Sequence, residues 1–199
     1  MKKIIYLLAI IIAFGACDSL VEEEVFSTIT PANFFQSERD VTTALVGVYD
    51  GVQDVNIWWR QFYTTELTGG LMRHNWSPGQ QTMTYEDDFG DAWNLWKLYY
   101  EGISRANAVL GALEGSTLDE TIKNRYEAEV RFLRAYTYFN LVRLYGQLPL
   151  VTKSPESLND VLAPDSTNTE AFESEFLKQR DRADVYAFII EDLEFAETN

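Results

Sequence analysis

Two long apolar patterns joined by a short polar link constrain the fold of this chain more than any other feature. Between residues 93 and 113, large apolar side chains recur at alternating spacings of three and four, and a second pattern of the same kind covers residues 118–145. Such spacings place apolar side chains on one face of an α-helix. Because only a few residues separate the two helices, they must fold back on each other as an antiparallel hairpin.

Local signals mark the ends of both helices. Gly115 follows the first pattern and is a natural helix stop. Residues 117–120 form a capping box led by Thr117, which predicts where the second helix begins. Gly146 and Pro149 end that helix.

Aromatic side chains carry much of both apolar faces. Trp93 and Trp96 lie on the first stripe and Phe139 lies on the second, so we expect all three side chains in the core. A buried Phe139 predicts a loss of about 3 to 5 kcal/mol in folding free energy when it is replaced by alanine.

Two further helices flank the hairpin in the sequence. Ser37 with Asp40 predicts a helix start, and an apolar face then recurs over residues 38–54. The last helix opens at Asp181 and has an apolar face of its own. Between the first helix and the hairpin, residues 57–67 are rich in aromatic side chains and compatible with a helix.

Glycine, proline and polar residues make the remaining segments irregular. Residues 69–91 and 152–180 carry most of these residues and are predicted to be largely loop. The sequence therefore predicts an all-α fold of tetratricopeptide-like helical hairpins with long irregular loops, although no repeat at the usual period of about 34 residues is visible. The last apolar face has no later helix to cover it, so we interpret the chain as a truncated protein or a fragment.

The amino terminus has the pattern of a secretory signal. Lys2 and Lys3 precede an apolar run over residues 4–14, and a Gly-Ala pair then leads to Cys17, the only cysteine of the chain. The run is too short for a transmembrane helix, which takes about 20 apolar residues. The arrangement resembles a bacterial lipoprotein signal, so residues 1–16 are predicted to be removed and Cys17 to be lipidated. An ordinary signal peptide followed by an incidental cysteine is the alternative.

The segment that follows the cysteine is short and acidic. Residues 17–36 carry Asp18 and a Glu cluster at 22–24 without an apolar pattern, so we expect a solvated tether between the lipid and the folded part. Acidic residues directly after the lipidated cysteine resemble the surface-export signal of Bacteroidetes lipoproteins. That resemblance places the protein on the outer membrane, facing the exterior of the cell.

Charge and cysteine content exclude two classes of protein. The formal net charge is −15 at pH 7, and no stretch rich in Lys or Arg interrupts the acidic pattern. A surface this acidic repels nucleic acid, so no nucleic-acid partner is expected. One cysteine cannot form a disulfide framework within the chain, so the stability must come from a packed core.

Several ordered motifs carry a resemblance to one known family. They cover residues 30–35, 44–49, 96–107, 129–139, 143–150 and 186–193. These stretches, together with the lipoprotein start, resemble the SusD/RagB nutrient-uptake lipoproteins of Bacteroidetes outer membranes. The most specific stretch reads EVRFLRAYTYF, and its one departure is Val130, where the family usually has alanine.

The resemblance implies a binding protein and not an enzyme, and it implies no cofactor. Family members sit over a SusC-like TonB-dependent outer-membrane transporter and deliver oligosaccharides or similar nutrients to it. They are much longer than this chain, so residues 37–199 resemble only the amino-terminal part of a SusD-like helical domain. The alternative is a tetratricopeptide-like scaffold that binds protein, or a truncated fragment without function.

One irregular segment has the side chains that sugar recognition needs. Arg73, His74, Asn75 and Trp76 supply a guanidinium, an imidazole, an amide and a flat indole within four residues. Aromatic faces stack on the apolar side of a sugar ring while polar groups bind its hydroxyls. These four residues are therefore the predicted ligand contacts, with local packing of the loop as the alternative reading.

A pair of adjacent tryptophans is a second candidate. Trp58 and Trp59 follow each other and cannot both face the same core, so one of them is expected to be exposed.

Charged residues also interrupt the most family-like helix. Glu129, Arg131 and Arg134 flank apolar residues, which fits either a site or internal salt bridges. Pairing with the neighbouring helix, with Arg105 as a partner, needs fewer assumptions.

Catalytic and metal chemistry find little support. Acidic residues 86–88 lack the spacing of an EF-hand loop and favour a solvated helix start instead. His74 is the only histidine, so no histidine metal cluster is available, and no metal site is predicted.

Overall fold

The computed structural model describes residues 35–70, 73, 90–155 and 178–199. Its elements in chain order are α2 (Glu38–Gln53), α3 (Val55–Phe62), the short π-helix η2 (Tyr63–Leu67), α5 (Gly90–Glu114), α6 (Glu120–Tyr145), β1 (Leu148–Pro149), β2 (Gln179–Arg180) and α8 (Arg182–Thr198). The two strands are two residues long and pair antiparallel. Helices therefore dominate the described part of the chain, which confirms the predicted all-α class.

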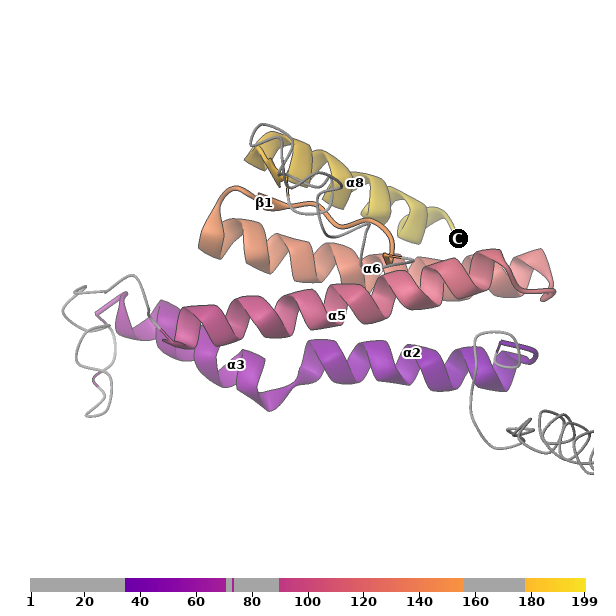
Figure 1. Cartoon of the computed structure of the whole chain (residues 1–199), viewed down its shortest axis with the longest axis horizontal. Coiled ribbons are helices and arrows are strands. Elements are labelled where there is room, and N and C mark those ends of the chain that lie inside the picture. Colours follow the sequence, from indigo (N-terminus) through magenta and orange to yellow (C-terminus); the bar gives the residue numbers. More distant parts are fainter. Residues whose placement is uncertain (1–34, 71–72, 74–89, 156–177) are drawn as a thin grey trace, which may run out of the picture. The chain divides into compact units, whose positions relative to one another are not determined.

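The predicted antiparallel hairpin is the centre of the fold. Helices α5 and α6 pack against each other along their lengths, and α2 and α3 cover α5. Helix α8 packs on α6 (Figure 1). None of the described helices is both long enough and apolar enough to cross a membrane.

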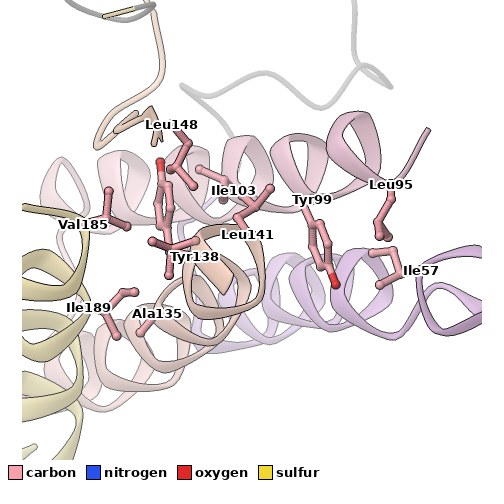
Figure 2. Packing of buried hydrophobic residues seen from close by; sticks show 11 residues of the cluster. Ile57, Leu95, Tyr99, Ile103, Ala135, Tyr138, Leu141, Leu148, Val185 and Ile189 are labelled. Carbon is pink, nitrogen blue, oxygen red and sulfur yellow. The ribbon is translucent and has the colours of Figure 1, made fainter. Parts of the chain in front are cut away.

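Two apolar clusters fill the interior, one in each half of the hairpin. The first joins α3, the start of α5, the end of α6, β1 and α8. Its buried members are Ile57, Leu95, Tyr99, Ile103, Ala135, Tyr138, Leu141, Val142, Leu148, Val185 and Ile189. Figure 2 shows these side chains, with Ile57 and Leu95 at one end of the cluster and Val185 and Ile189 at the other.

The second cluster lies near the hairpin turn and joins α2 to the end of α5 and the start of α6. Its buried members are Val41, Leu45, Val48, Ala106, Val109, Leu113, Tyr126, Val130, Leu133. Val130 is completely buried there. The side chain that departs from the family pattern is thus a packed core residue.

The predicted start of α2 is confirmed in detail. The Ser37 hydroxyl accepts a hydrogen bond from the backbone N–H of Asp40 at 3.4 Å, and an Asp40 carboxylate oxygen accepts one from the Ser37 N–H at 2.9 Å. This reciprocal capping box satisfies two backbone donors that the first turn cannot use.

The capping residue of α6 differs from the prediction. Asp119, and not Thr117, is the N-cap, and its carboxylate accepts a hydrogen bond from the Thr121 N–H at 2.9 Å. Helix α6 ends where expected, at Gly146, whose positive φ of 82° suits a residue without a side chain.

Two of the three expected core aromatics are exposed. Trp93 is 67% exposed because the buried line of α5 runs through Leu95 and Tyr99, and Trp93 faces away from that line. Phe139 is 39% exposed and stacks under the Arg143 guanidinium, 4.9 Å from its ring centre. Both core predictions were wrong.

Trp96 lies where the sequence placed it. It is partly buried against the first cluster, and its ring meets Tyr145 edge to face at 5.0 Å. Burial raises the pKa of Tyr145 to about 12, and its hydroxyl donates to the Ala92 carbonyl at 2.7 Å.

A buried ion pair joins α6 to α8. The Arg134 guanidinium donates to both carboxylate oxygens of Asp192 at 2.8 Å, and the two side chains are 5% and 0% exposed. Internal ion pairing is therefore confirmed for Arg131 and Arg134, whereas Glu129 accepts a hydrogen bond from the Tyr49 hydroxyl at 3.3 Å. The expected partner was wrong, because Arg105 instead pairs with Asp50 on α2 at 3.0 Å.

Side chains of the hairpin also hold the segment after α6. The Tyr100 hydroxyl donates to the Pro149 carbonyl at 2.7 Å. The Tyr138 hydroxyl donates to the Val151 carbonyl and accepts from the Val151 N–H, at 2.9 and 2.8 Å. The Asn107 amide donates to the same carbonyl at 2.9 Å. These contacts satisfy backbone groups of an irregular segment that would otherwise lack partners.

Candidate functional site

Most of the residues predicted to bind ligand lie outside the described part of the chain. His74, Asn75 and Trp76 are among them, as is the predicted lipidation residue Cys17. Arg73 is described and is exposed. It follows the turn after η2 by three residues in the sequence. The roles of all five residues stay predictions.

The described residues contain an exposed aromatic surface on α3. Trp58, Trp59 and Phe62 are 54%, 59% and 42% exposed, and we call these three side chains the aromatic ridge. The sequence predicted one exposed tryptophan, whereas both are exposed. Exposed aromatic groups that gather on one helix face commonly mark a binding surface.

The opposite side of α3 explains why the ridge faces outward. Ile57 is 4% exposed and belongs to the first core cluster. Gln61 lies one turn later on the same face as Ile57, because residues four apart share one side of a helix. With Ile57 and Gln61 turned inward, Trp58, Trp59 and Phe62 must lie on the outer side.

Hydrogen bonds fix the rotation of α3. The Gln61 amide oxygen accepts from the Tyr99 hydroxyl at 2.8 Å, and the Gln61 amide nitrogen donates to the Asn140 side-chain oxygen at 3.1 Å. Burial raises the pKa of Tyr99, so its hydroxyl keeps the proton that it donates. One residue of α3 is thereby bonded to both α5 and α6.

Ring contacts hold the ridge side chains themselves. The rings of Trp59 and Tyr63 meet edge to face at 4.5 Å, with an interplanar angle of 87°. The rings of Phe62 and Tyr63 meet at 6.0 Å and 67°. Such contacts contribute about 0.5–1.5 kcal/mol each. They restrict side-chain rotation before a ligand arrives, so less conformational entropy is lost on binding.

A second exposed apolar surface runs along the junction of α6 and α8. It comprises Phe132, Phe139, Tyr186, Ile190 and Leu193, between 38% and 53% exposed, and we call it the α6/α8 stripe. The rings of Phe139 and Tyr186 lie 6.5 Å apart across the two helices.

The described residues do not suggest metal chemistry. Among them, no group of three or more His, Cys, Asp or Glu side chains is placed to hold a metal ion. The ridge offers flat apolar faces, which suit contact with the apolar faces of a ligand.

Phe62 was not singled out from the sequence. The sequence feature that could have placed Phe62 beside Trp58 is their spacing of one helical turn. That spacing indicates an exposed position only once Ile57 and Gln61 are known to face inward.

The helical hairpins define a tetratricopeptide-like helical protein. Comparison with protein families identifies which one: the chain belongs to the SusD-like family, whose description is "Starch-binding associating with outer membrane" and whose pattern matches residues 20–198. It is a family of carbohydrate-binding proteins and not of enzymes. The resemblance found in the sequence is confirmed.

Individual relatives are similar to this chain over part of their length. SusD-like protein P2 of Formosa agariphila is 26% identical over 201 residues, which cover 98% of this chain and 37% of that protein. A SusD superfamily protein from Bacteroides vulgatus has a TM-score of 0.64 and 18% identity, covering 83% of this chain and 35% of that one. A laminarin-binding SusD-like protein has a TM-score of 0.58 and 26% identity, covering 81% and 34%.

Proposed function

We propose that this protein binds oligosaccharides at the outer-membrane surface and passes them to a SusC-like TonB-dependent transporter. The observation that carries the proposal is the aromatic ridge, whose rings are exposed on a helix held from behind by core contacts. Membership of a family described as starch-binding and associated with the outer membrane supports the same function.

The ridge supplies the apolar half of sugar recognition. The face of a pyranose ring that carries C–H groups packs on a flat indole or phenyl ring, and burial of that face is favourable in water. Trp58 and Phe62 are one turn apart along α3, so an extended saccharide can meet more than one ring. Arg73 and the predicted contacts His74, Asn75 and Trp76 would supply the groups that bind hydroxyls.

The location follows from the proposed processing. Removal of residues 1–16 and lipidation of Cys17 would anchor the protein, and residues 17–36 would connect the anchor to the helical part that begins at residue 37. Several buried acyl chains hold a protein at a membrane firmly, since each methylene contributes about 0.8 kcal/mol. The acidic start of the tether supports a position facing the cell exterior.

The chain spans only about 37% of its relative from Formosa agariphila. The ridge would therefore be one part of a larger recognition surface in proteins of that length. A laminarin-binding protein is among the similar structures, so β-linked glucans join starch fragments as the saccharides to examine first.

Calorimetric titration of tryptophan variants tests the proposal. The full chain in a detergent without a sugar headgroup would be titrated with laminarihexaose and maltoheptaose. We expect Trp58→Ala and Trp59→Ala each to weaken saccharide binding by about tenfold, which is about 1.4 kcal/mol. The matched control is Trp93→Ala, because Trp93 is equally exposed but lies outside the ridge.

The comparison with Trp93→Ala shows whether binding depends on the ridge or falls with the loss of any exposed tryptophan. Equal affinities for the parent chain and both ridge variants, or an equal loss in Trp93→Ala, would remove the ridge from the proposal. Circular dichroism should be unchanged in all three variants, since none of these side chains is in the core. Thermal unfolding should change only in Trp59→Ala, by the loss of its ring contact with Tyr63, which contributes about 0.5–1.5 kcal/mol.

A protein-interaction scaffold is the alternative function. The observation that favours it is the α6/α8 stripe, which exposes five large apolar side chains on the side of α6 that carries α8. This alternative predicts that ridge variants bind protein partners normally and that saccharides do not bind at all.

A further inference from the structure

A pocket of 480 Å³ lies at the turn end of the hairpin, away from the aromatic ridge. The last turn of α5 and the first four turns of α6 form its sides, and Thr152 also lines it. Its size falls within the usual range for small-molecule sites, about 300–1,000 Å³.

Ion pairs hold most of the charged side chains that line the pocket. Three acidic and three basic side chains reach it, and the basic ones are neutralised locally. Lys123 pairs with Glu120 at 3.1 Å, and Arg131 pairs with Glu127 at 2.7 Å. The third basic side chain pairs with a carboxylate that does not line the pocket. Among the described residues, one lining carboxylate therefore stays uncompensated, which disfavours an anionic ligand.

The inner wall of the pocket is rigid. The buried Arg134 donates to the Thr152 carbonyl at 3.1 Å and to the Asn107 side-chain oxygen at 2.7 Å. Its other hydrogen bonds are to Asp192, and its guanidinium stacks on the Phe188 ring at 4.8 Å. One guanidinium thus bonds α5, α8 and the segment after β1 to α6, which fixes the pocket shape before a ligand enters.

Two polar side chains of the pocket remain available. Within the described residues, the Glu114 carboxylate and the Asn124 amide have no side-chain hydrogen bond or ion pair. A carboxylate accepts hydrogen bonds, and an amide both donates and accepts them. Leu110 and Leu113 add an aliphatic surface beside these groups.

We propose that this pocket binds a neutral polyhydroxyl ligand, a saccharide of one or two rings, with Glu114 and Asn124 bonding its hydroxyls. Vicinal hydroxyls offer donors and acceptors that a carboxylate and an amide lining one pocket can bind. The choice of saccharides rests on the proposed function, but the site is separate from the ridge and shares no residue with it.

Nuclear magnetic resonance titration of the full chain tests the assignment. The probes are the neutral sugars maltose, laminaribiose and galactose, with glucose 6-phosphate as an anionic counterpart, in a detergent without a sugar headgroup. We expect at least one neutral sugar to give saturable shifts of the Glu114 and Asn124 resonances. The anionic counterpart should bind at least about fivefold more weakly, since the Glu114 carboxylate repels it.

Surface variants supply the second measurement. Asn124→Ala and Glu114→Gln should each weaken sugar binding at the pocket by about five- to tenfold, the effect of one lost hydrogen bond. Asn94→Ala on α5 and Glu191→Gln on α8 are matched controls, because these exposed side chains lie outside the pocket. None of the four changes removes a core contact.

A failure of the pocket proposal can be distinguished from a failure of the proposal that the ridge binds saccharides. The double variant Trp58→Ala/Trp59→Ala should leave the pocket shifts unchanged. Absence of saturable shifts with all three neutral sugars, tighter binding of glucose 6-phosphate, or equal effects of the pocket and control variants would overturn the assignment.

Discussion

Replacing Asp192 with alanine removes the carboxylate that bonds Arg134 between α6 and α8. The two side chains are joined by two hydrogen bonds of 2.8 Å, and Asp192 is completely buried. Without the carboxylate, the Arg134 guanidinium keeps its bonds to Asn107 and the Thr152 carbonyl. Asp192 is the one close anionic partner of Arg134 among the described residues, and the longer contact of Asp192 with Arg131 at 3.5 Å is lost as well.

The expected loss is large because a buried charge would remain uncompensated. Removing one member of a buried pair costs about 3–5 kcal/mol. Whole domains are stable by only about 5–15 kcal/mol, so this single change would consume a substantial part of the folding free energy. Asp192→Asn keeps one acceptor oxygen and should cost less than alanine.

Urea unfolding followed by circular dichroism would measure the difference. The matched control is Asp50→Ala, which breaks the Arg105 pair at the surface, where the Asp50 side chain is 79% exposed. Exposed pairs contribute about 0–1 kcal/mol. If Asp192→Ala and Asp50→Ala lost the same stability within about 1 kcal/mol, the account of the α6–α8 junction would be refuted.

Three further predictions concern the core, the tyrosines and the anchor. Leu141→Ala should cost about 2–5 kcal/mol in urea unfolding, and the half-exposed Phe139→Ala distinctly less; equal losses would contradict the assignment of the α6 face. Burial raises the pKa of Tyr145 from its usual value near 10 to about 12, so the folded state holds this proton more tightly. Its stabilising contribution is complete below about pH 10 and is lost as the pH rises to about 12, which absorbance at 295 nm and unfolding of Tyr145→Phe would check. Labelled palmitate should enter the parent chain and not Cys17→Ser, and incorporation by the variant would contradict lipidation at that residue.

Helix positions were predictable from the sequence because they depend on local spacing. Ser37 with Asp40 marked the start of α2, and Asp181 marked the start of α8. At α6 the capping box pointed two residues too early. Thr117 and Asp119 are both capping residues by type, and the choice between them depends on where the chain leaves α5.

Side-chain partners were less predictable because they depend on which helices become neighbours. The pairing of Arg134 with Asp192 joins residues far apart in the sequence, and Asp192 lies within an apolar pattern that gives no sign of a charge partner. Phe139 fits the same periodicity as true core residues, yet it falls at the edge of the α6 face. Periodicity defines a stripe, and the neighbouring helix decides how wide the buried part becomes.

The sequence predicted an exposed aromatic side chain at the candidate site, but it did not predict that both tryptophans would be exposed. Adjacent aromatic residues at Trp58 and Trp59 indicated that one side chain would be exposed. Both are exposed because Ile57 and Gln61 contact α5 and α6. Those contacts depend on the tertiary structure and cannot be inferred from local spacing.

The most direct test of saccharide binding at the ridge is a titration that observes the tryptophans themselves. The chain has five tryptophans, and each indole N–H gives a separate resonance that single Trp→Phe variants would assign. On addition of laminarihexaose or maltoheptaose, the Trp58 and Trp59 signals should shift saturably, while the partly buried Trp96 signal should not move. Unchanged Trp58 and Trp59 signals at saccharide concentrations that saturate the chain would contradict the proposal that the aromatic ridge binds the sugar.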